Sequence, residues 1–217
     1  DDYGAVVWIS GEESSADDTF NPTEQTLVTS YLNAGGNLFV SGAEIGWDLD
    51  NLNNGRSFYN NQLKADYAGD DANTYSVAAL PGSIFDGIAP FSFDNGSLVY
   101  DVEFPDQLNA FGGSTAALTY VGGSGGNAAM VFDGAFRVVN FGFPFETVVD
   151  PARRSELMAA VVGFFGISPG PGIVELVDCL SGPGGGYVAP QCADVDFDVD
   201  IDVDLVDFAE LQRLLAP

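Results

Sequence analysis

The fold is indicated by residues 3–42, which read YGAVVWISGEESSADDTFNPTEQTLVTSYLNAGGNLFVSG. In this stretch a sequence typical of a helix lies between two apolar runs. Residues 3–9 form a continuous apolar run, which suits a central parallel strand. Asn21-Pro-Thr-Glu24 opens a helix, because it supplies an N-cap, a proline in the first turn and a glutamate at the capping-box position. The helix ends at Gly35-Gly36, before a second strand at residues 37–41.

Two later stretches continue this order. Residues 128–132 and 136–142 form a hairpin-like pair of strands around a short Asp-Gly-Ala turn. A final helix starts at Asp150, which precedes a proline. The main domain, residues 1–167, is therefore expected to be a layered α/β sandwich. The buried stripe of its first helix is expected to consist of Leu27, Val28, Tyr31 and Leu32.

The composition excludes several kinds of partner. The chain has 217 residues, 46% of them hydrophobic, which is enough for one main domain and a small appendage. Its formal net charge of −26 makes DNA, RNA and anionic membranes poor partners and divalent cations good ones. No stretch reaches the ~20 apolar residues of a membrane span. No signal peptide is present at Asp1, so we expect that a secreted form has already lost it.

The tail carries the clearest indication of a ligand. Residues 193–208 read ADVDFDVDIDVDLVDF, without a lysine or arginine to neutralise the carboxylates. In an EF-hand loop, side-chain oxygens serve calcium from positions 1, 3, 5, 9 and 12, and a backbone carbonyl serves it from position 7. Only one register fits this spacing. It assigns the ligands to Asp196, Asp198, Asp200, Asp202 (through its carbonyl), Asp204 and Asp207.

The surroundings of this loop favour calcium, with one departure. Carboxylate oxygens without Cys or His ligands indicate calcium over a transition metal. Val203, at position 8, is expected to pack behind the loop, and residues 205–215 are expected to form a helix. Position 6 is usually glycine but is Ile201 here, so affinity is low or the turn relaxes differently. The alternative is a solvated acidic strand in which Val and Ile alternate with Asp.

The two cysteines also lie near the C-terminus. Cys179 and Cys192 flank a Gly/Pro-rich stretch, residues 181–190. A disulfide would close this loop and indicates an extracellular location, whereas the alternative is a pair of unlinked thiols. We expect residues 168–172 to be a Pro/Gly linker and residues 173–217 to be a small α-helical, calcium-binding appendage.

Several motifs resemble a known family. They are AVVW at residues 5–8, the stretch 31–42, QLKADY at 62–67 and FGFPFE at 141–146. Roughly residues 3–167 resemble glutamine-amidotransferase-like (class I) domains, in particular the xanthan lyase-associated type of large secreted bacterial proteins. This resemblance implies a Rossmann-like or flavodoxin-like, mostly parallel sheet with flanking helices. Residues 173–217 resemble half of a dockerin repeat, a helix pair with one EF-hand-type calcium loop.

The resemblance departs from the family at the nucleophile. Catalytic members end a strand in Gly-x-Cys-x-Gly, whereas residues 42–46 read GAEIG, so Glu44 replaces the cysteine. The chain contains no histidine, which excludes Ser-His-Asp, Cys-His and His-ligated zinc sites within one chain. We therefore expect no enzymatic activity. The remaining catalytic alternative is a carboxylate glycosidase or lyase in which Glu44 acts with Asp48 or Asp17. Otherwise Glu44 caps backbone N–H groups or faces solvent.

Two further features concern the surface. Asn95-Gly-Ser97 fits an N-glycosylation acceptor. Related domains usually carry a strand and a helix before the strand at residues 3–9. If that neighbour is absent, the strand offers its free edge to another chain. A head-to-tail contact of this kind grows filaments when it does not close.

The sequence thus supports three hypotheses. The leading one is a secreted, non-catalytic, calcium-stabilised structural protein that self-associates into an extracellular filament or surface assembly. The second is a carbohydrate-binding or accessory module of a polysaccharide-degrading system, with glycans as partners. The third is the carboxylate-dependent glycosidase or lyase.

Overall fold

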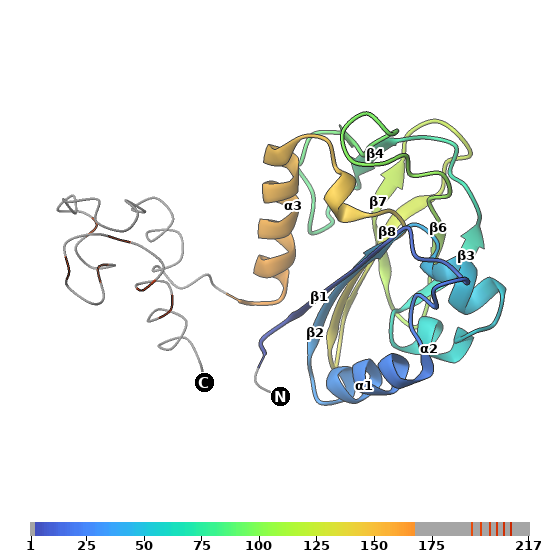
Figure 1. Ribbon diagram of the computed structural model, residues 1–217, viewed down its shortest axis with the longest axis horizontal. Coiled ribbons are helices and arrows are strands. Elements are labelled where there is room, and N and C mark those ends of the chain that lie inside the picture. Colours follow the sequence, from blue (N-terminus) through green and yellow to red (C-terminus); the bar gives the residue numbers. More distant parts are fainter. Residues whose placement is uncertain are drawn as a thin grey trace. The chain divides into compact units, whose positions relative to one another are not determined.

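The computed structural model describes residues 3–167 and, in the tail, residues 192, 196, 200, 203, 206 and 209. The chain divides into two compact units, Tyr3–Phe165 and Gly166–Pro217. Within the described residues, the first unit is built on a nine-stranded sheet (Figure 1). None of the described helices is long and apolar enough to cross a membrane, as the sequence predicted.

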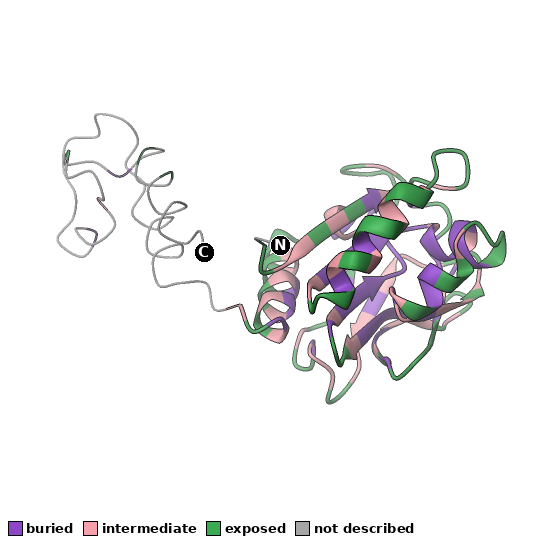
Figure 2. Ribbon diagram, turned by 90° about the horizontal axis from the view of Figure 1, so that it is seen from below, coloured by how far each residue is buried: buried purple, intermediate pink, exposed green. Residues whose placement is uncertain are grey.

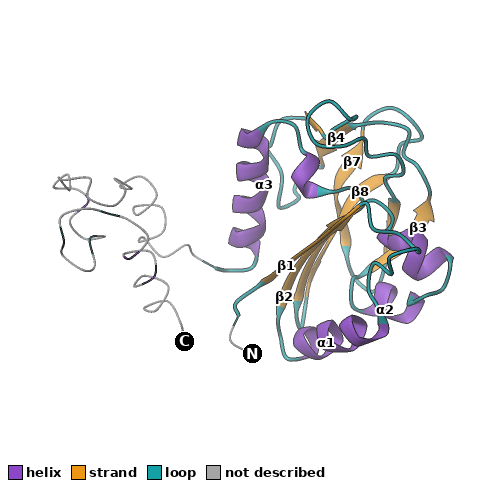
Figure 3. Cartoon of the chain, viewed as in Figure 1, coloured by secondary structure: helices purple, strands orange, loops and turns teal. Residues whose placement is uncertain are grey.

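Strands outnumber helices in this unit (Figure 3). The strands are β1 (Val6–Gly11), β2 (Asn37–Gly42), β3 (Ala65–Gly69), β4 (Ser76–Ala79), β5 (Phe91–Ser92), β6 (Gln107–Ala110), β7 (Thr115–Tyr120), β8 (Asn127–Asp133) and β9 (Arg137–Phe141). The helices are α1 (Pro22–Asn33), α2 (Arg56–Asn61) and α3 (Pro151–Phe164), with the short helical turns η1 (Trp47–Asn51) and η2 (Phe145–Thr147).

The sheet is mixed, so the expected Rossmann-like or flavodoxin-like, mostly parallel α/β fold is wrong. The strand order is β1-β2-β9-β8-β7-β4-β5, with β6 bridging β3 and β8. In the described part, β1–β2 and β2–β9 are parallel, and every other pair is antiparallel. A parallel pair needs a crossover connection, and α1 provides one between β1 and β2. From β3 to β9 no α-helix intervenes, so the chain doubles back and pairs antiparallel.

The apolar run at residues 3–9 forms a strand at the edge of the sheet and not at its centre. Among the described strands, β1 pairs with β2 alone. Val6 and Trp8 pack against the core on one face of the sheet. Val7 and Ile9 point to the other face and are 50% and 46% exposed. One face of this apolar strand therefore packs on the core, and its other face is about half exposed.

The start of α1 confirms the predicted capping box. Asn21 Oδ1 accepts hydrogen bonds from the N–H groups of Thr23 at 2.9 Å and Glu24 at 3.1 Å. Glu24 Oε2 accepts one from the N–H of Asn21 at 2.8 Å. These bonds satisfy N–H groups that have no partner inside the helix.

The inner face of α1 is narrower than predicted. Val28 and Leu32 are buried, but Leu27 is 64% exposed, so its assignment to the buried stripe is wrong. Val28 and Leu32 are four residues apart and therefore lie on the same face of the helix, toward the sheet. Leu27 lies on the neighbouring face, toward solvent. Tyr31 is partly buried, and its hydroxyl bonds both the N–H and the carbonyl of Asn37 at 3.1 Å.

The core lies on both faces of the sheet, where Figure 2 shows the buried segments. One face packs against α1, η1 and α2, and α3 lies on the other side, burying Leu157 and Val161 (Figure 1). The predicted pair of strands at 128–142 is confirmed as the antiparallel β8–β9 pair. Asp150 caps α3 by accepting the N–H of Ala152 at 2.9 Å. The second face holds a cluster of aromatic rings formed by Phe39, Phe85, Phe93, Phe141 and Phe143.

Candidate functional site

The segment after β2 makes the strand-to-helix turn that the sequence predicted around Glu44. Side chains crowd both of its glycines. A Cβ on Gly42 would lie 2.9 Å from the Ile45 side chain, and one on Gly46 would lie 2.7 Å from the Tyr59 hydroxyl. Glu44 itself is partly buried and is not among the residues with positive φ. The turn therefore lacks the strained backbone typical of a nucleophile elbow.

Glu44 lies in an acidic cleft at the carboxyl ends of β1 and β2. The cleft has a volume of about 170 Å³, and Glu12, Ala43, Glu44, Glu103 and Phe104 line it. Glu12 follows β1 and Glu44 closely follows β2, so the parallel pairing brings the two carboxylates to the same edge of the sheet. Phe104 is 43% exposed and gives the cleft an apolar wall.

Glu12 lines this cleft and has a raised pKa. Partial burial raises the pKa of the Glu12 carboxyl above its ordinary value. Nearby negative charges raise it further, in the order Glu103, Asp101, Glu146 and Glu44. A carboxylic acid with a raised pKa beside a second carboxylate is the arrangement that general acid catalysis requires.

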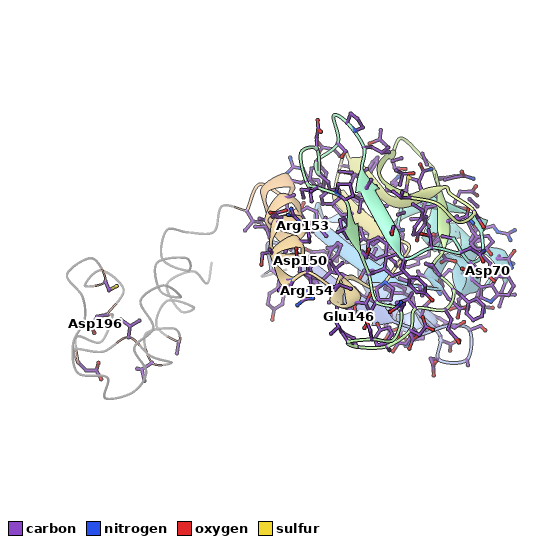
Figure 4. The ribbon with its side chains drawn as sticks, turned by 90° about the horizontal axis from the view of Figure 1, so that it is seen from above. Asp70, Glu146, Asp150, Arg153, Arg154 and Asp196 are labelled. Carbon is purple, nitrogen blue, oxygen red and sulfur yellow. The ribbon has the colours of Figure 1, made fainter. Side chains whose placement is uncertain are left out.

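A hydrogen-bonded pair lies beside Gly11 at the end of β1. The Tyr100 hydroxyl donates to Glu146 Oε1 at 2.5 Å. A Cβ on Gly11 would come within 3.3 Å of both side chains. Burial, followed by the bond to Glu146, raises the pKa of Tyr100. Figure 4 shows Glu146 near the first turn of α3, which is labelled by Asp150 and its neighbours.

Asp106 lies buried beneath the turn. Its Oδ2 accepts hydrogen bonds from the N–H groups of Gly46 at 2.6 Å and Trp47 at 3.3 Å. The residue is 1% exposed, and its Oδ1 has no partner in the described part of the chain. Burial raises the pKa of Asp106 well above its ordinary value, and the charges of Asp70 and Glu44 add to this effect, against the two backbone bonds. Asp106 therefore supports the turn and is not open to solvent.

The two partners that the sequence suggested for Glu44 do not line the cleft. Asp48 is fully buried and accepts hydrogen bonds from the Thr19 N–H at 3.1 Å, the Thr19 hydroxyl at 2.8 Å and the Asn54 amide at 2.6 Å. It is a structural carboxylate. Asp17 is exposed in the loop between β1 and α1.

Glu12 and Glu103 were missed by the sequence reasoning. Glu12 had a usable signal, since it follows β1 directly and the parallel neighbour β2 ends next to Glu44. Glu103 had none, because a long loop before β6 brings it to the cleft.

The free edge of β1 is the second candidate surface. We call residues Val6–Gly11 the β1 edge. It contains no charged residue and no proline, the residues that usually protect an edge strand from pairing with another chain. Val7 and Ile9 add an exposed apolar surface beside the side of β1 that does not pair with β2.

Most of the predicted calcium loop lies outside the described residues, including Asp198, Asp202, Asp204 and Asp207. Asp196, labelled in Figure 4, accepts a hydrogen bond from the N–H of Asp200 at 3.2 Å. Val203 is fully buried. The six described tail residues contain no group of three potential metal ligands, so the calcium site stays a prediction.

Two other predictions concern modification. Cys192 is buried and is not a free thiol, but Cys179 lies outside the described residues, so the disulfide between them stays a prediction. Asn95 is exposed, and the Ser97 hydroxyl of the same motif donates to Asp94 at 2.9 Å. Glycosylation of Asn95 is untested.

Comparison with known proteins does not identify this chain. No family model and no curated protein matches it. Among solved structures, the mmIFT52 N-terminal domain superposes with a TM-score of 0.48 at 15% identity, covering 75% of this chain and 78% of that one. The exo-β-1,4-mannosidase Op5Man5 from Opitutaceae bacterium strain TAV5 gives a TM-score of 0.43 at 16% identity. That match covers 66% of this chain and 23% of the mannosidase. Neither likeness is close enough to carry an argument about function.

Proposed function

We propose that this chain is an extracellular, non-catalytic structural protein that associates with further copies of itself through the β1 edge. One observation carries the proposal: β1 is an apolar edge strand that pairs with β2 alone among the described strands. Its Val7 and Ile9 side chains are about half exposed. Pairing with a second strand would give partners to the backbone groups on the side of β1 that β2 does not pair, and it would partly cover both side chains.

The distribution of charge favours the β1 edge as the contact between copies. The formal net charge of −26 opposes association over most of the surface. The β1 edge is uncharged, so two copies of it can meet with little local repulsion. Two β1 edges related by a two-fold axis form a closed dimer. Pairing of β1 with another sheet edge, β3 or β5, gives an open filament when the rotation between copies does not close into a ring.

The acidic tail is proposed to bind calcium. Calcium bound by Asp196, Asp200 and the other aspartates of the predicted register would neutralise the acidic run and stabilise the second unit. Glu44, with an ordinary φ and no histidine in the chain, is poorly suited to nucleophilic catalysis.

Sedimentation velocity tests the proposal. In about 1 mM calcium, within the range of extracellular modules, we expect the wild-type protein to sediment as oligomers. Ile9→Lys should sediment as a monomer, because a charge in the edge prevents pairing. Its melting temperature should stay within about 2 °C of wild type, since Ile9 is 46% exposed.

Leu27→Lys is the matched control. Leu27 is 64% exposed on α1, so this variant makes the same charge change away from the β1 edge and should still associate. A monomeric wild-type protein would contradict the proposal, and so would equal sedimentation of the two variants.

A carboxylate-dependent glycosidase is a second candidate, favoured by the shared cleft of Glu12 and Glu44. Glu12 with its raised pKa would act as the acid and Glu44 as the second carboxyl group. We expect release of reducing ends from neutral polysaccharides to fall at least about 100-fold in Glu12→Gln and in Glu44→Gln. Glu13→Gln, an exposed change outside the cleft, should keep full activity. No activity in wild type, or unchanged activity in both cleft variants, rejects this candidate.

A further inference from the structure

A groove of about 610 Å³ lies between α1 and α2, within the size range of ligand sites. Its described lining contains no charged side chain, although the chain carries a net charge of −26. In contrast, the acidic cleft contains three carboxylates, and the hollows at Asp50 and at Asp133 also contain carboxylates. The groove shares no residue with the acidic cleft or the β1 edge.

The polar groups of the groove are mainly hydrogen-bond acceptors. The Thr26 hydroxyl donates to the Pro22 carbonyl at 2.8 Å, and the Ser30 hydroxyl donates to the Thr26 carbonyl at 3.0 Å. With their protons used inside α1, these oxygens keep lone pairs for a ligand. Across the groove, the Asn61 amide likewise donates to the Ser57 carbonyl at 2.8 Å.

Gln62 is an independent sign that a donor is missing. Its Oε1 is buried and has no hydrogen-bond partner among the described residues. A buried acceptor without a partner is costly, and a ligand donor would remove that cost. The ligand should therefore bring several donors at once.

We propose that the α1–α2 groove binds a neutral saccharide chain, whose hydroxyl groups donate to Gln62 Oε1 and to the hydroxyl oxygens of α1. The apolar lining consists of Pro22 and the largely buried Phe58, which offers the sugar C–H groups a floor but gives a peptide few anchoring pockets. The net charge of −26 disfavours acidic saccharides and nucleic acids. This binding goes beyond the proposed structural role and does not depend on it.

The test is an NMR titration of the full chain, labelled with ¹⁵N, with neutral hexasaccharides of glucose, xylose and mannose. It is run on wild type and on Ile9→Lys, so that failure of self-association does not affect the outcome. We expect at least one neutral hexasaccharide to shift the amides of α1 and α2 and to leave those around Glu44 unchanged. A hexasaccharide of galacturonic acid should produce no shifts.

Two variants separate binding from folding. Gln62→Leu should weaken binding at least about fivefold, with an unchanged or higher melting temperature, because the amide oxygen has no partner to lose. Thr26→Val should also weaken binding, whereas Thr23→Val, on the same helix but outside the groove, should not. The proposal is overturned if no neutral hexasaccharide shifts α1 and α2 at about 10 mM, far above useful affinity. Equal affinities of Thr26→Val and Thr23→Val would also overturn it.

Discussion

Buried aspartates decide much of the polar structure at the scale of single residues. Asp94 is fully buried, and its carboxylate accepts hydrogen bonds from the N–H groups of Ser97, Leu98 and Val99. Burial alone would raise its pKa, but these bonds lower it below the ordinary value. At Asp106 the effect of burial outweighs the effect of the hydrogen bonds, so the pKa is raised. One of its carboxylate oxygens has no partner in the described part of the chain. The two aspartates therefore respond to pH in opposite directions.

Asp106→Asn should reduce the pH dependence of stability. Because the folded-state pKa of Asp106 is raised, its contribution to stability is fully present below the unfolded-state pKa, about 4, and is lost as pH rises through the folded-state pKa. The neutral asparagine can keep an acceptor for Gly46 and Trp47 without this loss. Urea unfolding between about pH 4 and pH 8 should show wild type losing stability relative to the variant as pH rises. Parallel pH profiles would contradict this prediction.

At the scale of secondary-structure elements, the sequence predicted features that depend on neighbouring residues, but it did not predict which distant strands pair. The capping box at Asn21, the β8–β9 pair and the start of α3 after Asp150 depend on neighbouring residues, and the structure confirms them. The partners of β1 and β3 depend on residues far along the chain. Strands β3 to β6 are shorter than β1 and β2 and lack long apolar runs, so the antiparallel half of the sheet could not be predicted from them.

The candidate site shows the same division. The turn at residues 42–46 could be predicted from its glycines, and Glu44 lies in a cleft as a site residue would. Its neighbours could not be predicted, because Glu103 reaches the cleft through tertiary folding. Asp48 was misassigned because a carboxylate bonded to Thr19 and Asn54 has the same sequence signature as one in an open site.

Asn21→Ala should destabilise the main domain through α1. The change removes Asn21 Oδ1 and with it the hydrogen bonds that this oxygen accepts from the N–H groups of Thr23 and Glu24. The expected loss is about 1 kcal/mol in the free energy of unfolding, with an unchanged denaturant slope in urea. Asn21→Asp keeps a cap oxygen and should lose much less. Equal losses in the two variants would show that the cap does not stabilise α1.

Charge and the calcium loop matter at the scale of the whole molecule. With 32 acidic and 6 basic residues, the chain carries many carboxylates without basic partners, and those of the tail are the most concentrated. A bound cation acts there on the local repulsion, whereas added salt screens repulsion over the entire surface. Specific calcium binding can therefore be distinguished from general screening by comparing substitutions at ligand positions with substitutions elsewhere in the acidic run.

Asp200→Ala should abolish calcium binding, because it removes the ligand at loop position 5. Isothermal titration of EDTA-treated wild type should give a single site with a dissociation constant on the order of 10⁻⁴ to 10⁻³ M. Asp194→Ala is the matched control, since it removes a carboxylate from the same run but outside the predicted register. Equal weakening by both changes would indicate diffuse attraction to an acidic strand.

The β2–β9 pairing has a consequence for how the chain folds. It joins residue 37 to residue 137, whereas the β8–β9 pair closes within a few residues and β1–β2 closes around α1. Closing so large a loop costs entropy before any contact offsets it, and such distant contacts slow folding. We therefore expect the β1–α1–β2 segment and the β8–β9 pair to form early and to meet late. During that interval the side of β2 that pairs with β9 would be open, and newly made chains would be most prone to aggregate.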